Sequence, residues 1–263
     1  MAAGLLQKSQ FDQHPMIRFP VFTLRSLFVL TVLIVVFTTC KEDEGPENWQ
    51  LLTEFPGKKR SFTSACDDKK CYVFFGFHTL WSSGGGNGMY SNEVWAYDVA
   101  TDTWKQRKDY TGVSRESASA FTLGNSIYIV GGQNHDQDYG WPYNPELNEV
   151  LKYTPATDSW SKMNDFPGES RRDALTFTVN NQAYIGFGSS YNHGLLKDLW
   201  AYDAVLDQWT QLPEFPGTLT AQYERIHGGN GDLLINFVFG NEIILVTGSH
   251  ELASEMWSFD VVK

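Results

Sequence analysis

The sequence predicts an all-β protein built from four copies of one strand-rich repeat. Its 263 residues include 9 Trp, 12 Tyr and 23 Gly, while only 19% are charged, and this composition favours strands and turns over helices. The 42% of hydrophobic residues are enough for one sizeable core. A tryptophan recurs at similar spacing, at Trp49, Trp104, Trp160 and Trp209. Recurrence of this kind is typical of proteins that stack one structural unit several times.

Each repeat contains a predicted β-hairpin. Its second strand is apolar and ends in a glycine, and the four copies occupy residues 71–76, 127–132, 183–188 and 243–248. The hairpin turns hold residues that tolerate a positive φ, namely Gly124-Asn125, Asn180-Asn181 and Gly240-Asn241. These signals place two antiparallel strands in each copy.

Two further strands follow each hairpin. The third strand lies within residues 92–98, 148–154, 197–203 and 254–260, where an acidic residue precedes an apolar run. In three copies a tyrosine of this strand stands seven residues before the next tryptophan, at Tyr97, Tyr153 and Tyr202. The tryptophan marks a fourth strand, so we expect sheets of four antiparallel strands.

The pattern of a hairpin ending in glycine, then Tyr-Asp, then Trp, resembles the kelch repeat from residue 48 to residue 263. The resemblance implies a β-propeller with four blades, each of four antiparallel strands, around a central channel. Small residues in the first strands, such as Ser117 to Ala120, fit crowding near that axis. The sequence departs from the family where Phe75, Phe187 and Thr247 replace the first of two glycines.

The order of strands also predicts how the ring closes. The repeat region opens with a tryptophan strand at residues 48–50 and stops after residue 260. We therefore expect the N-terminal strand to join the C-terminal blade, with Trp49 packed beside residues 256–260, which would remove an exposed sheet edge. Because kelch propellers usually have more than four blades, a truncated gene is the alternative.

The N-terminal segment predicts export and a lipid anchor. Arg18 and Arg25 precede an uncharged apolar run that ends at Cys40, as in a secretory signal peptide. Residues 37–40 resemble a bacterial lipobox, which implies lipidation of Cys40. Lys41 to Glu44 resemble a signal for the outer face of a Gram-negative outer membrane. We expect a signal peptide at residues 1–39, a lipidated acidic tether at 40–47 and a propeller at 48–263. Residues 1–15 precede Met16, which is a more ordinary start and would place them outside the translated protein. The alternative is cleavage elsewhere, with Cys40 incidental.

Two cysteines remain if Cys40 carries lipid. Cys66 and Cys71 flank a polar four-residue turn between two apolar runs, where a hairpin can bring them together. An oxidising compartment would permit a disulfide. Two buried free thiols are the alternative that the sequence leaves open.

Charge and missing motifs exclude several classes of function. The formal net charge of −11 disfavours contact with nucleic acid. The sequence contains no nucleophile elbow, phosphate loop or zincin motif, and it gives no reason to expect a cofactor. Kelch folds include galactose oxidase and sialic-acid epimerases, but a fold alone does not license an activity.

Aromatic residues gather in loops that follow the hairpins. These loops and the linkers between blades emerge on one face, which is the ligand face in kelch propellers. Aromatic rings beside amides and carboxylates suit a sugar or a protein ligand, although they also pack against their own blade. The candidates are Trp81, Tyr90, His135, Asp136, Tyr139, Trp141, Tyr143 and Tyr191.

Repeated cations and histidines add further candidates on this face. Arg60, Arg115 and Arg171 each follow a glycine by three residues and could hold a carboxylate, but repeated acidic residues nearby make internal ion pairs a strong alternative. One histidine follows the closing glycine of each blade. A metal ring is a weak interpretation because the offsets differ, and independent polar positions are the alternative for His78, His135, His193 and His250.

These observations predict a surface-displayed lipoprotein that binds a glycan or protein ligand and touches the membrane only through its lipid. A small-sugar isomerase or mutarotase of the sialic-acid epimerase type is the second hypothesis. A truncated, non-functional propeller is the third.

Overall fold

The computed structural model describes residues 49–57, 59–78, 89–134, 146–217, 219, 235–247 and 255–262. Every helix or strand assigned within these ranges is a β-strand, and all of them lie in the compact unit that runs from Leu51 to Lys263. A search of these residues finds no helix that could cross a membrane.

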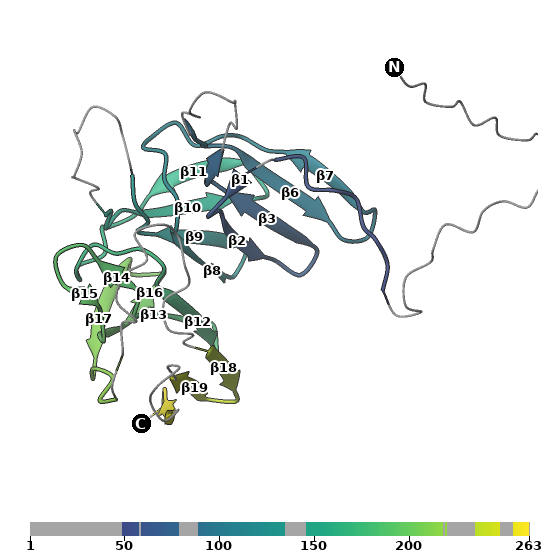
Figure 1. Ribbon diagram of the computed structural model, residues 1–263. Helices are drawn as coiled ribbons and strands as arrows, with labels where there is room; N and C mark the ends of the chain where they lie inside the picture. Colours follow the sequence, from purple (N-terminus) through teal and green to yellow (C-terminus); the bar gives the residue numbers. More distant parts are fainter. Residues whose placement is uncertain are drawn as a thin grey trace, which may run out of the picture. The chain divides into compact units, whose positions relative to one another are not determined.

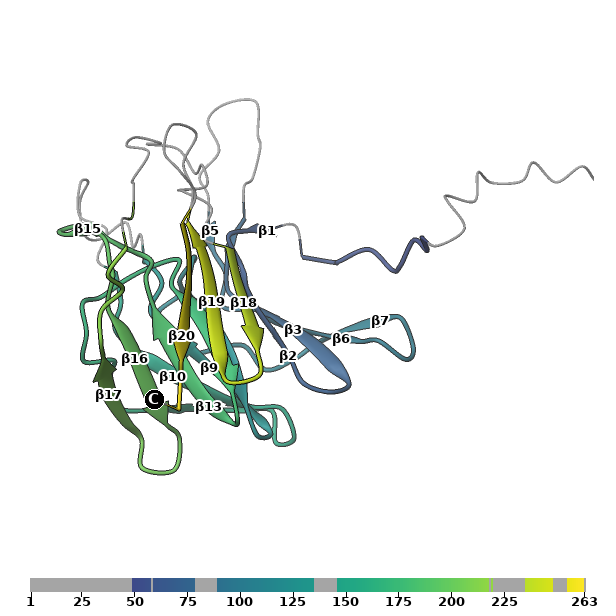
Figure 2. The same ribbon diagram turned by 90° about the horizontal axis from the view of Figure 1, so that it is seen from below.

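The strands form successive antiparallel sheets, which we call blades (Figures 1 and 2). In spatial order, the first blade contains β2 (Thr63–Cys66), β3 (Lys70–Phe74), β6 (Val94–Asp98) and β7 (Thr103–Gln106). The second contains β8 (Ser119–Leu123), β9 (Ser126–Val130), β10 (Val150–Thr154) and β11 (Ser159–Lys162). The third contains β12 (Leu175–Val179), β13 (Gln182–Gly186), β16 (Leu199–Asp203) and β17 (Gln208–Leu212). In the described part of the fourth are β18 (Ile235–Phe239), β19 (Glu242–Thr247) and β20 (Glu255–Asp260).

Two small sheets accompany the blades. One joins β1 (Lys59–Arg60), β4 (Phe77–His78) and β5 (Met89–Tyr90), and the other joins β14 (Ser189–Ser190) and β15 (Gly194–Leu195). They lie where the linkers before the blades and the loops after the hairpins come together, because β1 belongs to a linker and β4 follows the hairpin of the first blade. The expected convergence of linkers and loops on one face is therefore confirmed.

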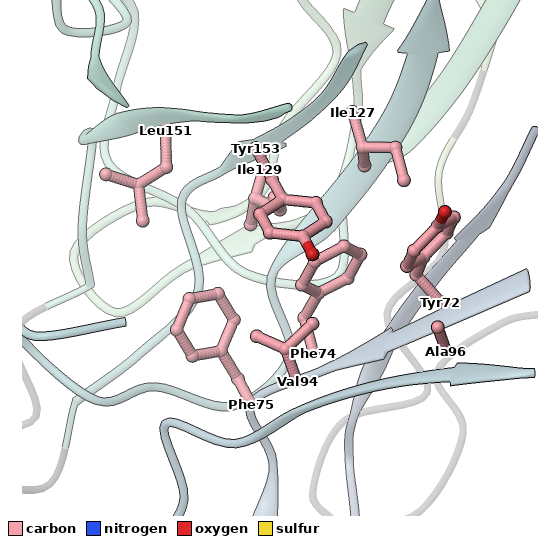
Figure 3. Close-up of a cluster of buried hydrophobic side chains, with 9 residues drawn as sticks. All are labelled: Tyr72, Phe74, Phe75, Val94, Ala96, Ile127, Ile129, Leu151 and Tyr153. Carbon is pink, nitrogen blue, oxygen red and sulfur yellow. The ribbon is translucent and has the colours of Figure 1, made fainter. Parts of the chain in front are cut away.

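Apolar side chains fill the space between successive blades. The strand β9 is buried along its whole length, because alternate residues face the blades on either side. Ile127 and Ile129 pack with Phe74 of the first blade, whereas Tyr128 and Val130 pack with residues of the third blade. In the first of these interfaces the Tyr153 ring meets the Phe74 ring edge-on, with centroids 5.5 Å apart (Figure 3).

Hydroxyl groups connect the innermost strands, which follow one another as β2, β8, β12 and β18. Thr63 Oγ1 donates to the Ala118 carbonyl at 2.7 Å, and Ser119 Oγ donates to the Ala174 carbonyl at 2.6 Å. Small hydroxyl residues suit these strands because they reach a neighbouring backbone without forcing the strands apart. The predicted crowding of the first strands is thereby confirmed.

A repeated latch explains the Tyr and Trp pattern of the sequence. Tyr97, Tyr153 and Tyr202 each donate a hydrogen bond of 2.7 Å to an aspartate five residues later. In the second blade that aspartate, Asp158, accepts the backbone N–H of Lys108, and Trp160 Nε1 donates to the Lys108 carbonyl. Lys108 belongs to the linker that precedes the blade, so each latch ties a blade to the chain segment entering it.

The N-terminal segment follows the same rule from Thr53 onward. Thr53 N donates to Asp102 Oδ1 at 2.9 Å, and Thr53 Oγ1 donates to the Asp102 carbonyl at 2.8 Å. These bonds tie Thr53 to the first blade, while Trp49 is 80% exposed and Leu51 97% exposed. The latch fixes Thr53 to the first blade. The closure expected of residues 48–53 is not shown by the described residues and stays a prediction.

The hairpin turns match the sequence prediction. Gly124, Asn180, Asn181 and Gly240 all have φ between 50° and 60°. In the first blade, Cys66 and Cys71 are directly opposite each other in the β2–β3 ladder, and the structure joins them in a disulfide.

Candidate functional site

Three glycines define equivalent positions on the face where the loops after the hairpins meet the linkers between blades. Gly76, Gly132 and Gly188 have φ of 103°, 90° and 78°, a region that L-residues rarely adopt. A Cβ at these glycines would lie 2.9, 2.8 and 2.5 Å from one backbone carbonyl each, and the carbonyls belong to Arg60, Glu116 and Arg172. These three residues, one per blade, are therefore structurally equivalent.

The residues just before them form a buried layer of cations. Lys59 Nζ lies 3.2 Å from Glu93 Oε2, Arg115 pairs with Glu149, and Arg171 reaches both carboxylate oxygens of Asp198 at 2.7 and 2.6 Å. Their side chains are 0%, 0% and 1% exposed.

Arg115 and Arg171 were candidates for ligand contact, and the structure places both in internal ion pairs. Both also donate to backbone carbonyls, of Gly131 and Phe187 respectively, so their guanidinium groups are committed inside the fold. The internal ion pair, which was the alternative, holds for both. The first blade uses Lys59 at this position, and Arg60 is the exposed residue that follows it.

The ion pairs shift the pKa values of their carboxyl groups. Burial alone would raise the pKa of Asp198, but hydrogen bonds from Arg171 and Trp200 outweigh it and hold that pKa below its usual value. The pKa of Glu93 is lowered in the same way, by a hydrogen bond from Trp95 and the charge of Lys59 against the effect of burial. These carboxylates are ionised partners of buried cations.

A different arrangement surrounds Arg172. Arg172 Nη1 donates to Gln133 Oε1 at 3.1 Å, and Gln133 Nε2 donates to Glu116 Oε1 at 2.8 Å. Arg172 Nε also lies 3.9 Å from Glu146 Oε1, beyond hydrogen-bond distance. We call Glu116, Gln133, Glu146, Arg172 and Asp173 the Arg172 cluster.

The cluster combines buried amides with a half-exposed guanidinium. The side chain of Arg172 is 42% exposed, whereas that of Glu146 is 5% exposed. Gln133 and Asn134 are each 7% exposed, and Asn134 Oδ1 has no hydrogen-bond partner among the described residues. Buried polar atoms without partners are uncommon in folded proteins, so this group is a candidate for ligand contact.

Two carboxyl groups of the cluster have raised pKa values. Desolvation raises the pKa of Glu146, even though the Tyr191 backbone and Arg172 act in the opposite direction. Desolvation, with a contribution from the charge of Glu116, raises the pKa of Asp173. Asp173 is nevertheless accessible to solvent. A carboxyl group of this kind holds a proton at a higher pH than an ordinary one, which suits a general acid.

Backbone geometry fixes Asp173 in this place. Ser61, Ser117 and Asp173 have φ of 51°, 55° and 54°, and they are linked in series by backbone bonds from Ser117 N to Ser61 O and from Asp173 N to Ser117 O. Strained backbone of this kind often accompanies functional sites.

Tyr191 lies next to the cluster. Its backbone N–H donates to Glu146 Oε2 at 2.8 Å, and its side chain is 66% exposed on the β14–β15 hairpin. Glu169 steadies this hairpin, because its Oε1 atom accepts from Ser190 Oγ and lies 3.0 Å from His193 Nδ1. The structure thus places an exposed aromatic ring on a segment tied directly to the cluster.

Tyr90 and Arg60 lie on the same side. Phe77 lies between them: the Tyr90 ring meets it edge-on at 5.0 Å, and the Arg60 guanidinium lies 5.1 Å from its centre. Burial raises the pKa of Tyr90, and the charge of Glu116 raises it further. Tyr90 is therefore a neutral hydroxyl at ordinary pH and lies within electrostatic reach of the cluster.

Several predicted site residues lie outside the described residues, so the structure does not test them. They are Trp81, His135, Asp136, Tyr139, Trp141, Tyr143 and His250, together with Cys40. Of the other histidines, His78 lies 3.6 Å from a Glu93 oxygen and His193 pairs with Glu169. Within the described ranges no group of three or more His, Cys, Asp or Glu side chains could hold a metal.

Comparison with known proteins supports the fold. The family described as "Kelch motif" matches residues 114–167. The N-acetylneuraminate epimerase of Pasteurella multocida (strain Pm70) is 25% identical over 253 residues, which cover 82% of this chain and 63% of that protein. The enzyme of the same name from Escherichia coli O1:K1 / APEC is 25% identical over 177 residues, which cover 66% of this chain and 42% of that protein. This chain therefore spans less than two thirds of the length of either relative.

A solved structure agrees with these matches. The structure of YjhT superposes with a TM-score of 0.55 at 19% sequence identity, covering 74% of this chain and 60% of that one. The repeated antiparallel blades, the matched motif and this likeness together show that the chain has the kelch-type β-propeller fold.

Proposed function

We propose that the chain is a binding module for a small sugar that bears a carboxylate, held at the Arg172 cluster. The observation that carries this proposal is the contrast between Arg172 and the cations of the buried layer. Arg171 is saturated by Asp198, whereas Arg172 keeps 42% of its side chain exposed and has no carboxylate within hydrogen-bond distance among the described residues. Arg172 Nε donates to Ser189 Oγ and Nη1 donates to Gln133 Oε1, so a ligand carboxylate would accept from the remaining hydrogens on Nη1 and Nη2.

The neighbours of Arg172 suit the rest of a sugar. Gln133, Asn134 and Glu146 offer amide and carboxyl groups to hydroxyls, and the exposed Tyr191 ring offers a flat face to C–H groups. The relatives named for N-acetylneuraminate support the same ligand class, because that sugar carries a carboxylate. A protein ligand remains an alternative for the aromatic loops and is an outcome of the test below.

The test is a calorimetric titration with N-acetylneuraminate and, separately, with its neutral methyl ester. The wild-type protein should bind the acid and bind the ester at least about tenfold more weakly, because a charge-assisted pair is lost. Arg172→Ala should reduce affinity for the acid to that for the ester, while Lys105→Ala, which removes an exposed cation of β7, should change neither. Equal affinity for acid and ester would refute the proposal. Absence of binding to either would favour a protein ligand or a non-functional propeller.

A catalytic role is a second candidate, favoured by the raised pKa values of Glu146 and Asp173. Exchange of sugar anomers needs a group that gives a proton to the ring oxygen and another that takes one from the anomeric hydroxyl. A carboxyl group with a raised pKa near the exposed Arg172 is a candidate for the first of these. NMR exchange rates of the bound sugar would separate the two roles. Binding without faster anomer exchange means a binding module, whereas acceleration that is lost in Asp173→Asn means an enzyme.

The proposal includes display at the cell surface through lipid on Cys40. Cys40→Ala should release the protein from the membrane fraction and abolish metabolic lipid labelling. Deletion of residues 41–44 should keep the label but protect the protein from external protease. Unchanged labelling of the Cys40 variant would overturn the anchor, and unchanged protease access of the deletion would reduce those residues to a tether.

A further inference from the structure

The first blade repeats the arrangement that surrounds Arg172 in the third. Arg60 and Arg172 each pair with the residue that follows the closing glycine of their blade. Each arginine is thereby joined to one of the two small sheets, and each small sheet carries a tyrosine. Tyr90 lies in β5, and Tyr191 lies in the turn between β14 and β15. The two blades therefore present the same two groups, a guanidinium and a phenol.

The second blade lies between these two positions. The residues just after the three equivalent ones are hydrogen-bonded in series, from Ser117 N to Ser61 O at 3.0 Å and from Asp173 N to Ser117 O at 2.9 Å. Backbone segments that share such a bond lie about 5 Å apart. Two steps of this kind place the backbones of Arg60 and Arg172 roughly 10 Å apart. In Figure 2, β1, β5 and β15 accordingly lie along one side of the blades.

A row of polar groups connects the two arginines. Arg172 Nη1 donates to Gln133 Oε1, and Gln133 Nε2 donates to Glu116 Oε1. Burial raises the pKa of Tyr90, the charge of Glu116 raises it further, and the charge of Arg60 lowers it. Both charges therefore lie near the Tyr90 hydroxyl. The arginines stand at the two ends of a row that has one carboxylate between them.

Arg60 is available to an anion. It is exposed, and its guanidinium lies 5.1 Å from the centre of the Phe77 ring. Its neighbour Lys59 pairs with Glu93, whereas Arg60 forms no ion pair within the described part of the chain. Contact with an aromatic face uses the charge of a guanidinium without using all of its N–H donors. Arg60 can therefore donate to a carboxylate as Arg172 can.

We propose that the ligand is an oligosaccharide with at least two acidic sugar units, of which one carboxylate is held by Arg172 and another by Arg60. This rests on the proposed binding of an acidic sugar at the Arg172 cluster and extends it to a second subsite. Tyr191 and Tyr90 lie beside the two subsites and suit the apolar faces or hydroxyls of the sugar rings. A glycan with a single acidic group would engage only one of the two arginines.

The test compares two disaccharides of similar size by calorimetric titration. One joins two N-acetylneuraminate units and carries two carboxylates, and the other joins N-acetylneuraminate to galactose and carries one. The wild-type protein should bind the first at least about tenfold more tightly, because a second charge-assisted pair forms. Arg60→Ala should abolish this difference. The matched control Lys105→Ala, which removes an exposed cation of β7, should preserve it.

A second variant tests the path between the subsites. Glu116→Gln removes a negative charge from the row between the arginines, while its amide oxygen can still accept from Gln133. Affinity for the disaccharide with two carboxylates should rise severalfold, because the ligand then crosses a neutral group. Circular dichroism of each variant checks its folding. An unchanged or lower affinity in the folded Glu116→Gln variant would overturn this path for the ligand.

The outcomes separate this inference from the function on which it rests. If the wild type prefers N-acetylneuraminate to its methyl ester but binds both disaccharides equally, the site at Arg172 stands and the second subsite is overturned. A preference for two carboxylates that survives Arg60→Ala also overturns it. Equal affinity for N-acetylneuraminate and its ester would overturn the proposed function itself, and this inference with it.

Discussion

Arg171 and Arg172 are neighbours in the chain, yet their side chains differ in burial and in ion pairing. Arg171 is 1% exposed on its side chain and makes two short bonds to Asp198, and it repeats a role that Lys59 and Arg115 play in the first and second blades. The side chain of Arg172 is 42% exposed and meets the neutral Gln133 Oε1 at 3.1 Å and the buried Glu146 carboxylate at 3.9 Å. A buried charge that recurs with an acidic partner in the first three blades supports the fold. A position whose residue type changes between these blades is under no such structural constraint and can serve a ligand.

The carboxyl groups beside the two arginines differ in the same sense. The pKa of Asp198 is lowered, because hydrogen bonds from Arg171 and Trp200 exceed the effect of burial. The pKa of Asp173 is raised, because burial dominates and the charge of Arg172 compensates it only in part. The ionised Asp198–Arg171 pair therefore stabilises the folded state. Ionisation of Asp173, by contrast, lowers the stability of the folded state.

The largest effect should come from breaking the buried pair. Arg171→Ala leaves Asp198 half-buried without its cation, and the expected loss is about 3–5 kcal/mol of unfolding free energy. Arg172→Ala is the matched control and should change it by about 0.5 kcal/mol or less. Urea denaturation of both variants measures the difference. Equal losses would show that the two arginines share a structural role.

A smaller effect should appear when pH is varied. Because the pKa of Asp198 is lowered in the folded state, its ion pair stabilises the protein above the ordinary pKa of an aspartate, about 3.9, and loses this effect as pH falls through the folded value. The stability difference between wild type and Asp198→Asn should therefore be largest near pH 7 and should shrink as the pH falls below 4. A difference that stays constant over this range would contradict the ion-pair account.

The smallest expected effect is an increase in the unfolding free energy. Asp173→Asn removes a carboxyl group whose pKa is raised, so it should stabilise the folded protein at pH 7, by about 0.5 kcal/mol or less because the group is exposed to water. Asparagine tolerates the positive φ at this position, so no backbone strain is added. The gain should diminish as pH falls and the wild-type carboxyl becomes protonated. Thermal unfolding at pH 7 and pH 4 measures it, and destabilisation at pH 7 would refute the assignment.

The blades could be predicted from the sequence because their signals are local and repeated. Gly76, Gly132 and Gly188 mark strand ends where a Cβ would meet a backbone carbonyl, and the tyrosines mark the latch to an aspartate five residues later. The same constraint acts in each blade, so the same residue type returns at the same spacing.

The Arg172 cluster could not be predicted in the same way. Its equivalent positions hold Arg60, Glu116 and Arg172, so no residue type repeats. Sequence spacing is also misleading here. The buried cation of the first blade, Lys59, stands two residues after Gly57, whereas Arg115 stands three residues after Gly112. An alignment on these glycines therefore matches the exposed Arg60 with the buried Arg115, which is not its structural equivalent. The structure separates the buried cations from the residues that follow them, because each closing glycine approaches the backbone carbonyl of one residue in the second set.

The most direct measurement of the central claim is the position of a bound acidic sugar in a crystal structure of the complex. The account predicts that the ligand carboxylate lies within hydrogen-bond distance of the Arg172 guanidinium, with Gln133 and Tyr191 beside the ring. Arg115 and Arg171 should keep their bonds to Glu149 and Asp198 unchanged. A carboxylate bound to either of those buried arginines, or a sugar bound away from Arg172, would contradict it.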